Sequence, residues 1–309
     1  MAERIAVVSV DLDEIPCYAA IHGLETAVAG AAHAIYDRAL PRLERLFAEE
    51  GVPATFFAIG ADLARAENAG ALRRFVAAGH EIANHSLGHL YDLTRRGRHV
   101  VRAEIAGGIE AIERATGERP VGFRAPGYTI TDEVFDVLGE LGVAYDSSVF
   151  PCPPYYAAKA AAIGAIRARG RRSHSVVDDP RVLTAPADPY RVGRPYWTRG
   201  DGIVELPVGV TRGWSGRLPY IGTSVALSGE RGARVLTRLI AGRPVVSLEL
   251  HGIDLADAAE DGLAFLAPHQ PDLRKPAAAK ERALRAALHE LRARGYAFVC
   301  AREAAATVP

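Results

Sequence analysis

Short apolar runs rich in β-branched residues alternate with helix-like segments about seven times along this 309-residue chain. The runs have the length and composition of strands buried on both faces, and a glycine closes several of the helical segments. This alternation predicts a parallel sheet covered by helices, either a closed barrel or a doubly wound sheet. The predicted strands are 5–10, 54–59, 81–84, 121–124, 143–145, 203–208, 245–250 and 296–300. The predicted helices are 27–39, 41–50, 61–78, 100–116, 132–141, 157–167, 231–240 and 280–294.

A barrel is the favoured arrangement, because polar residues follow several different strands. Barrels build their sites in this way at the carboxyl-terminal rim. The sequence contains no Gly- or Ser-rich linker and no repeat of about 20–50 residues. We therefore expect a single domain over 1–309, with an irregular insertion rich in arginine and proline at about 149–202 and a short tail at 303–309.

Composition excludes several classes of protein. Lys plus Arg and Asp plus Glu number 37 each, so no bulk charge favours nucleic acid. No apolar run approaches the roughly 20 residues that a membrane span needs. Cys17, Cys152 and Cys300 are an odd and widely spaced set, which argues against a disulfide framework. With no apolar leader evident, we expect a reduced, cytoplasmic protein.

Two pairs of polar residues stand directly after predicted strands. Asp11 and Asp13 follow the first strand, and His85 and His89 follow the third. Two imidazoles and one carboxylate are a common ligand set for a catalytic metal. Each pair alone is also compatible with a structural role, as packed or surface histidines and as aspartates that cap a turn.

Later strands are also followed by residues that carry chemistry. Arg124 begins Arg-Ala-Pro-Gly-Tyr128, Asp146 begins Asp-Ser-Ser, and His251 ends a β-branched run. The structural alternatives are an arginine paired with a surface carboxylate, an aspartate that caps a turn with its serines, and a structural histidine.

Taken in order, these stretches resemble the motifs of the NodB-type polysaccharide deacetylases, carbohydrate esterase family 4. The resemblance is close over about 4–150 and looser over 203–300. Leu12 separates the two aspartates, as in the subgroup that includes allantoinase-like and intracellular peptidoglycan-deacetylase-like proteins. The five motifs are Ser9-Val-Asp11-Leu-Asp13, His85-Ser-Leu-Gly-His89, Arg124-Ala-Pro-Gly-Tyr128, Tyr145-Asp-Ser-Ser148 and Leu248-Glu-Leu-His251.

The resemblance implies a distorted (β/α)7 barrel, a divalent metal that is usually zinc, and hydrolysis of an N-acyl group from an amino sugar. Asp13, His85 and His89 would be the metal ligands. Asp11 would be the general base that deprotonates the attacking water, and Arg124 would hold Asp11 ionised and oriented.

The same resemblance implies the remaining roles. His251 would be the general acid, which the poor leaving group of an amide requires. Asp146 would orient His251 and favour its charged form. The backbone N–H near Tyr128 would help to hold the oxyanion, and Gly127 would widen the acyl pocket. The segment 14–22 would overlie the site.

The implied substrate is a carbohydrate, and a cytoplasmic location favours a soluble or lipid-linked precursor. The run Arg167-Ala-Arg-Gly-Arg-Arg172 either contacts a phosphate on a nucleotide- or lipid-linked sugar or forms a solvated loop. Two other functions stay open: a cyclic amide or ureide hydrolase of the allantoinase-like branch, where the metal can be absent, and a non-catalytic glycan-binding protein. Relatives with the spaced motif often assemble, so a homo-oligomer is also expected.

Overall fold

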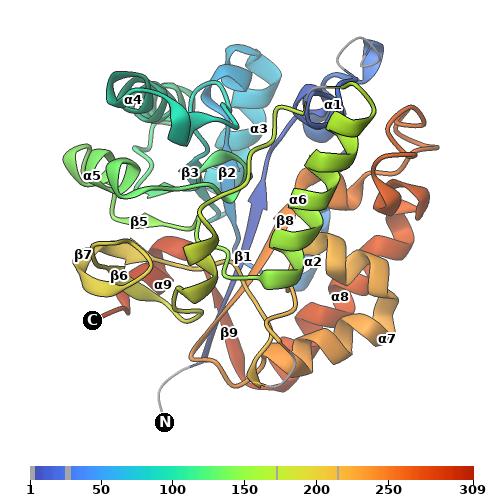
Figure 1. The fold of residues 1–309 in the computed structure, drawn as a ribbon. Coiled ribbons are helices and arrows are strands. Elements are labelled where there is room, and N and C mark those ends of the chain that lie inside the picture. The colour runs from blue at the N-terminus through green and yellow to red at the C-terminus, as the bar shows by residue number, and fades with distance from the viewer. Residues whose placement is uncertain (1–3, 25–28, 172, 214–215) are drawn as a thin grey trace.

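The computed structural model describes residues 4–24, 29–171, 173–213 and 216–309. A curled sheet runs through the molecule and helices cover its outer side (Figure 1). The strands are β1 Arg4–Asp11, β2 Thr55–Ala58, β3 Glu81–Asn84, β4 Gly122–Phe123, β5 Tyr145–Asp146, β6 Tyr190–Val192, β7 Arg199–Glu205, β8 Val245–His251 and β9 Tyr296–Val299. The helices are α1 Ile15–His22, α2 Leu40–Glu50, α3 Ala66–Ala77, α4 Arg98–Thr116, α5 Asp132–Glu140, α6 Pro153–Ala168, α7 Gly222–Ile240, α8 Ala277–Ala293 and α9 Ala301–Ala306.

The sheet has the order β6-β7-β5-β4-β3-β2-β1-β8, and β9 pairs with the first half of β1. Every pair is parallel except β6 with β7. Between β7 and β8 the described residues make isolated bridges, such as Ile221 with Glu249, in place of a continuous ladder. The predicted distorted barrel is therefore confirmed, with its irregularity at this seam. That the whole chain is one domain stays a prediction.

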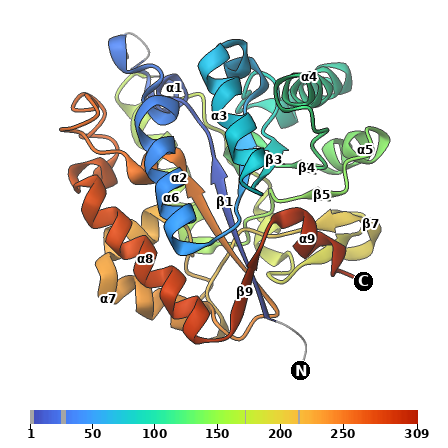
Figure 2. The ribbon, with the colours of Figure 1, turned by 180° about the vertical axis from the view of Figure 1, so that it is seen from behind.

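Burial on both faces explains why the predicted strands form. Val8, Val10 and Leu248 are fully buried beneath α2 and α8, which Figure 2 shows on the outer side of β1 and β8. Each predicted strand has a counterpart within a few residues. The prediction did not include β6, a short edge strand within the insertion.

Four helical regions differ from the prediction. The segment 14–22 contains α1, which begins after Glu14 with Pro16 in its first turn. In the insertion, α6 begins at Pro153 rather than at 157, because proline is tolerated in a first turn. Helix α7 starts at Gly222 and includes a break at Gly229 with φ 64°, so the prediction covered only its second half. Of the predicted helix 27–39, Ile35–Ala39 is helical and 25–28 lie outside the described residues.

The predicted tail at 303–309 was wrong, because α9 is a packed helix. Ala301, Ala304 and Ala305 are buried in one apolar cluster with Val7, Phe57 and Tyr145. The N–H of Cys300 donates to Glu303 at 2.8 Å, which closes a capping box. Alanines give little hydrophobic contrast in a sequence, yet their small size lets this helix pack closely against the sheet.

Ala304→Glu is expected to lower the free energy of unfolding by about 2–4 kcal/mol, since it places a charge and extra volume in this cluster. Ala306→Glu is the matched control, because Ala306 is exposed on the same helix. Urea unfolding of both variants measures the difference. Equal stability of the two variants would show that α9 is not packed as described.

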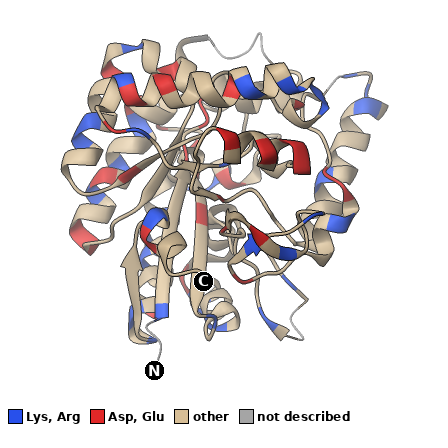
Figure 3. Cartoon of the chain, turned by 90° about the vertical axis from the view of Figure 1, so that its left-hand side faces the viewer, with Lys and Arg blue, Asp and Glu red and all other residues tan. Residues whose placement is uncertain are grey.

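Acidic and basic residues are interspersed over the outer helices (Figure 3), in agreement with the balanced composition. Over the described residues, no helix combines the length and the apolarity that crossing a membrane requires.

Candidate active site

The candidate residues meet at the carboxyl ends of the strands. Asp11 ends β1 and lies directly opposite His251, the last residue of β8, in the parallel register. His85 and Arg124 follow β3 and β4, which are also neighbours in the sheet. Parallel strands therefore bring to one rim residues that are far apart in the chain, as the sequence predicted.

Asp13, His85 and His89 form a buried cluster. The Nε2 atom of His85 lies 3.2 Å from Oδ1 of Asp13, and the Nε2 atom of His89 lies 3.3 Å from Oδ2. Burial opposes ionisation of Asp13, but the two histidines outweigh it and hold the pKa of this carboxyl well below its usual value. The cluster thus offers one anionic oxygen donor and two imidazole nitrogens.

The two histidines are placed by a loop and not by a helical turn. Ser86 and His89 have φ angles of 67° and 53°, in the left-handed region that side chains seldom adopt. The N–H of His89 donates to Oγ of Ser86 at 3.0 Å, and the N–H of Gly88 donates to the Glu104 carboxylate at 2.8 Å. Such strain is tolerated where the surroundings fix the backbone, and it is frequent at functional sites.

The cluster fits a divalent metal. Oδ1 of Asp13 and both ring nitrogens of His89 are buried without a hydrogen-bond partner among the described residues. One ligand atom of each residue lies within 4.8 Å of the others. Nδ1 of His85 contacts the carbonyl of Arg124 at 2.7 Å, which directs Nε2 towards Asp13; metal-binding histidines usually make such a hydrogen bond through their other ring nitrogen.

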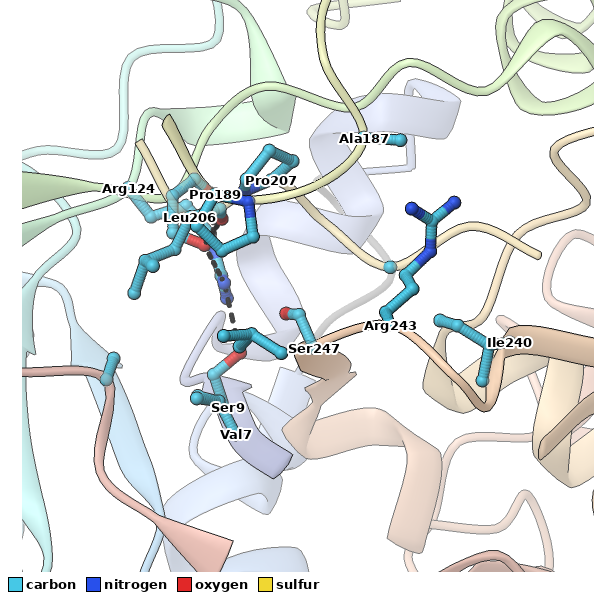
Figure 4. Close-up of a pocket in the computed structure, with 14 residues that line it drawn as sticks. Val7, Ser9, Arg124, Ala187, Pro189, Leu206, Pro207, Ile240, Arg243 and Ser247 are labelled. Atoms are coloured by element: carbon cyan, nitrogen blue, oxygen red, sulfur yellow. Dashed lines mark hydrogen bonds between the residues drawn. The ribbon is translucent and has the colours of Figure 1, made fainter. Parts of the chain in front are cut away.

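Asp11 is held by Arg124 beside this cluster. The Nη1 atom of Arg124 donates to Oδ1 of Asp11 at 2.6 Å, while Oδ2 lies 3.8 Å from Nε2 of His85. The guanidinium also donates to the hydroxyls of Ser9 and Ser147, at 3.0 and 2.8 Å. Arg124 and Ser9 are shown in Figure 4. Phe57 packs against it at 4.0 Å. Asp11 therefore keeps one oxygen directed towards the cluster, as a base requires, and the alternative of a surface ion pair is wrong.

Arg124→Lys is expected to lower kcat/KM about 10–100-fold, because an ammonium keeps the charge but cannot bond Asp11 and both serines from a planar fork. The comparison is Arg98→Lys, an exposed arginine that pairs with Glu140 at 2.6 Å. Steady-state kinetics on a cleaved substrate measure both. An unchanged rate for Arg124→Lys would mean that charge alone holds Asp11.

His251 has a carboxylate partner that the sequence analysis did not name. Oε1 of Glu249 lies 2.9 Å from Nδ1 of His251. Burial lowers the pKa of His251, but Glu249, together with Asp11 and Asp13, outweighs burial and holds the pKa well above the usual value, which favours the charged imidazole. The signal was present in the fifth motif, since residues two apart on a strand face the same side.

The predicted contact of Asp146 with His251 was wrong. Asp146 accepts hydrogen bonds from the N–H and the hydroxyl of Ser148, both at 2.8 Å, and Oγ of Ser148 accepts the N–H of Ala125 at 2.8 Å. Asp146 also faces Glu205 across the β5–β7 register. Burial and the charge of Asp146 hold the pKa of Glu205 well above its usual value. Asp146 therefore fixes the loop after Arg124, and the turn-capping alternative is the one that the structure bears out.

The predicted oxyanion donor is already in use. The N–H of Tyr128 donates to the carbonyl of Ala125 at 3.0 Å within the turn Pro126–Tyr128. The Tyr128 ring lies 6.1 Å from the His251 ring, so this residue lines the site through its side chain. Gly127 has a φ of 63°, and an added Cβ would lie 3.2 Å from Tyr91, so the turn favours glycine; that Gly127 widens the acyl pocket stays a prediction.

The segment 14–22 lies beside the site, as predicted. The Tyr18 ring of α1 is 6.2 Å from the His251 ring, and the Tyr91 hydroxyl is 3.5 Å from the carbonyl of Cys17. On the opposite side, Tyr155 of α6 packs against Tyr128 at 5.9 Å. Helix α6 crosses in front of β8 (Figure 1), so the insertion covers part of the rim.

Together, a distorted barrel, a three-residue ligand set, an oriented carboxylate and a charged histidine define a hydrolase-like site at the rim of an α/β fold. Residues 33–145 match the family model described as polysaccharide deacetylase. This match over part of the chain supports the resemblance to the NodB-type polysaccharide deacetylases that the sequence motifs implied. The spaced Asp-x-Asp subgroup stays a prediction.

Two curated relatives are similar to parts of this chain. A chitooligosaccharide deacetylase of Sinorhizobium fredii (strain NBRC 101917 / NGR234) is 38% identical over 105 residues, which are 34% of this chain and 47% of the relative. A peptidoglycan deacetylase of Helicobacter pylori (strain ATCC 700392 / 26695) is 26% identical over 161 residues, or 50% of this chain and 54% of the relative. The similarity thus spans about half the length of these relatives.

Solved structures share the fold. A Mycobacterium smegmatis protein assigned to the polysaccharide deacetylases superposes with a TM-score of 0.55 at 20% identity, covering 96% of this chain and 93% of that one. The Xyl-CE4 domain of a multidomain xylanase from the hindgut metagenome of Trinervitermes trinervoides gives a TM-score of 0.51 at 14% identity, covering 97% and 89%.

Proposed function

We propose that the protein is a divalent-metal-dependent hydrolase that removes an N-acyl group, acetyl or formyl, from an amino sugar. The observation that carries the proposal is the buried Asp13, His85 and His89 cluster, with Asp11 on one side of it and the charged His251 across the strand register. The curated relatives that act on chitooligosaccharides and peptidoglycan support a carbohydrate substrate.

Zinc is the proposed metal, because two imidazoles and one carboxylate are a ligand set it commonly has in hydrolases. Bound at Asp13, His85 and His89, it would polarise the scissile carbonyl and make water a better nucleophile near neutral pH. The metal site is deeply placed, since all three ligands are buried.

The chain's own residues supply the proton transfers. Asp11 accepts a proton from water through the oxygen that Arg124 leaves free. His251 then donates a proton to the amide nitrogen, which would otherwise leave as an unstable anion. Glu249 keeps that proton on His251 until the carbon–nitrogen bond breaks.

The same proposal includes the group to which the amino sugar is attached. Free cysteines at 17, 152 and 300 support the proposed cytoplasmic location, and with it a soluble, nucleotide-linked or lipid-linked amino sugar as substrate.

Acetate release from chitotetraose and from N-acetylglucosamine, with zinc supplied, tests the proposal. We expect release with the wild-type chain and none with Asp11→Asn. Ring opening of allantoin without acetate release would favour the cyclic-amide branch. Glycan binding without turnover of any substrate would favour a non-catalytic protein. Either result overturns the proposal.

A further inference from the structure

A second feature lies next to the metal-ligand cluster and takes no part in the proton transfers. It is a cleft of about 710 Å³ whose lining includes His89 and Tyr91. The α1 residues Pro16 and Cys17 line one side, and the end of α6 with the segment that follows it lines another. A space of this volume can hold a sugar with a substituent.

The charged side chains of the cleft are mostly basic. Arg95, Arg96 and Arg167 line it together with a single acid, Asp92. Asp92 pairs with Arg96, whose Nη2 lies 2.8 Å from Oδ2. Among the ion pairs that the described residues make around this cleft, that of Arg96 with Asp92 is present, and none involves Arg95 or Arg167. Three positive charges against one negative charge leave two guanidinium groups available to a ligand.

The arginine run that ends α6 divides between two clefts. Arg167 lines the cleft beside His89, whereas Arg169 and Arg171 line a separate cleft of about 380 Å³ with His22 and His269. Arg172 lies outside the described residues. The exposed arginines of the run are therefore divided between two clefts. Arg95 is far from Arg167 in the sequence and lines the same cleft. The positive charge of the cleft therefore does not come from a single run of neighbouring arginines.

We propose that this cleft binds an anionic group, a carboxylate or a phosphate, carried by the amino sugar whose N-acyl group lies at the metal site. The proposal rests on the proposed function, because it assigns the position of the anion relative to the scissile amide. Guanidinium groups suit both anions, since they bond two oxygens of either one in a planar fork. The anionic group would lie near the amide, because the proposed metal ligand His89 is among the residues that line the cleft.

Three matched sugars test the proposal: N-acetylglucosamine, N-acetylmuramic acid, which adds a carboxylate, and N-acetylglucosamine 6-phosphate. Each is measured by acetate release and, independently, by calorimetric binding to the zinc-loaded protein. For Arg95→Ala with Arg167→Ala, we expect KM and Kd to rise about tenfold for the anionic sugars and less than about twofold for the neutral one. Solvent and salt limit the effect of exposed charges to this range.

The double variant Arg169→Ala with Arg171→Ala is the matched control, because it removes the same charge from the same segment but from the other cleft. We expect this variant to change KM and Kd by less than about twofold for each of the three sugars. If Arg95→Ala with Arg167→Ala raises KM and Kd for N-acetylmuramic acid alone, the anion is a carboxylate. If it raises them for N-acetylglucosamine 6-phosphate alone, the anion is a phosphate.

An equal effect of the two double variants, or an equal effect on all three sugars, would overturn the anion site. If no sugar releases acetate, the proposed function fails. The binding titrations then still decide whether Arg95 and Arg167 select anionic sugars.

Discussion

Replacing Asp13 and His85 with alanine is expected to remove the bound metal and to lower deacetylation on the order of 10⁴-fold. The variant keeps His89 as a single ligand, which is too few for tight binding of a divalent ion. A catalytic metal supplies several kcal/mol of transition-state stabilisation, and each 1.4 kcal/mol corresponds to a tenfold change in rate. Elemental analysis of protein purified without chelator should give about one metal ion per wild-type chain and almost none in the variant.

A thermal unfolding series gives a readout that does not depend on activity. Zinc at about 100 times its dissociation constant should stabilise the wild-type chain by about 2.7 kcal/mol and leave the double variant unchanged. His99→Ala is the control, because His99 is an exposed histidine away from the cluster. Metal retained by the double variant would place the site elsewhere. A wild-type chain that binds no metal even with added zinc would exclude the proposed hydrolase.

Much of the fold could be predicted because it depends on hydrophobic alternation. Buried parallel strands and the helices that cover them leave that pattern in the sequence. The prediction failed where packing depends on small or polar side chains. Helix α9 uses alanines, which give little hydrophobic contrast, and a glycine break at 229 separates the first half of α7 from the half that was predicted. The seam between β7 and β8 depends on tertiary contacts that no local pattern records.

The candidate site was predictable to the extent that its residues follow strands. Position after a strand correctly brought Asp11, Asp13 and His85 together, because the carboxyl ends of parallel strands share one rim. Position after a strand does not predict which carboxylate contacts His251. Asp146 lies on β5, well along the sheet from β8, whereas Glu249 lies on β8 itself. Spacing within one strand was the better guide, since it requires no knowledge of strand order.

This difference leads to the second large effect, that of Glu249→Gln on the pH dependence of activity. Glutamine removes the largest of the charges that raise the pKa of His251, and burial then lowers that pKa against the charges of Asp11 and Asp13 only. The general acid loses its proton at a lower pH, so the alkaline limb of the kcat profile should move to lower pH. At pH 7 we expect kcat to fall about 10²–10³-fold, within the usual range for a general acid. The loss should diminish as the pH is lowered.

Asp146→Asn distinguishes this arrangement from the one that the motif implied. Asp146 bonds Ser148 and faces Glu205, so its replacement should disturb the loop after Arg124 without moving the alkaline limb. A kcat profile of each variant from about pH 5 to pH 10, with metal content checked at both ends, measures the two limbs. A limb that moves in Asp146→Asn and stays in place in Glu249→Gln would return the orienting role to Asp146. A limb that moves only in Glu249→Gln establishes that the carboxylate two residues before His251 on β8 sets its charge.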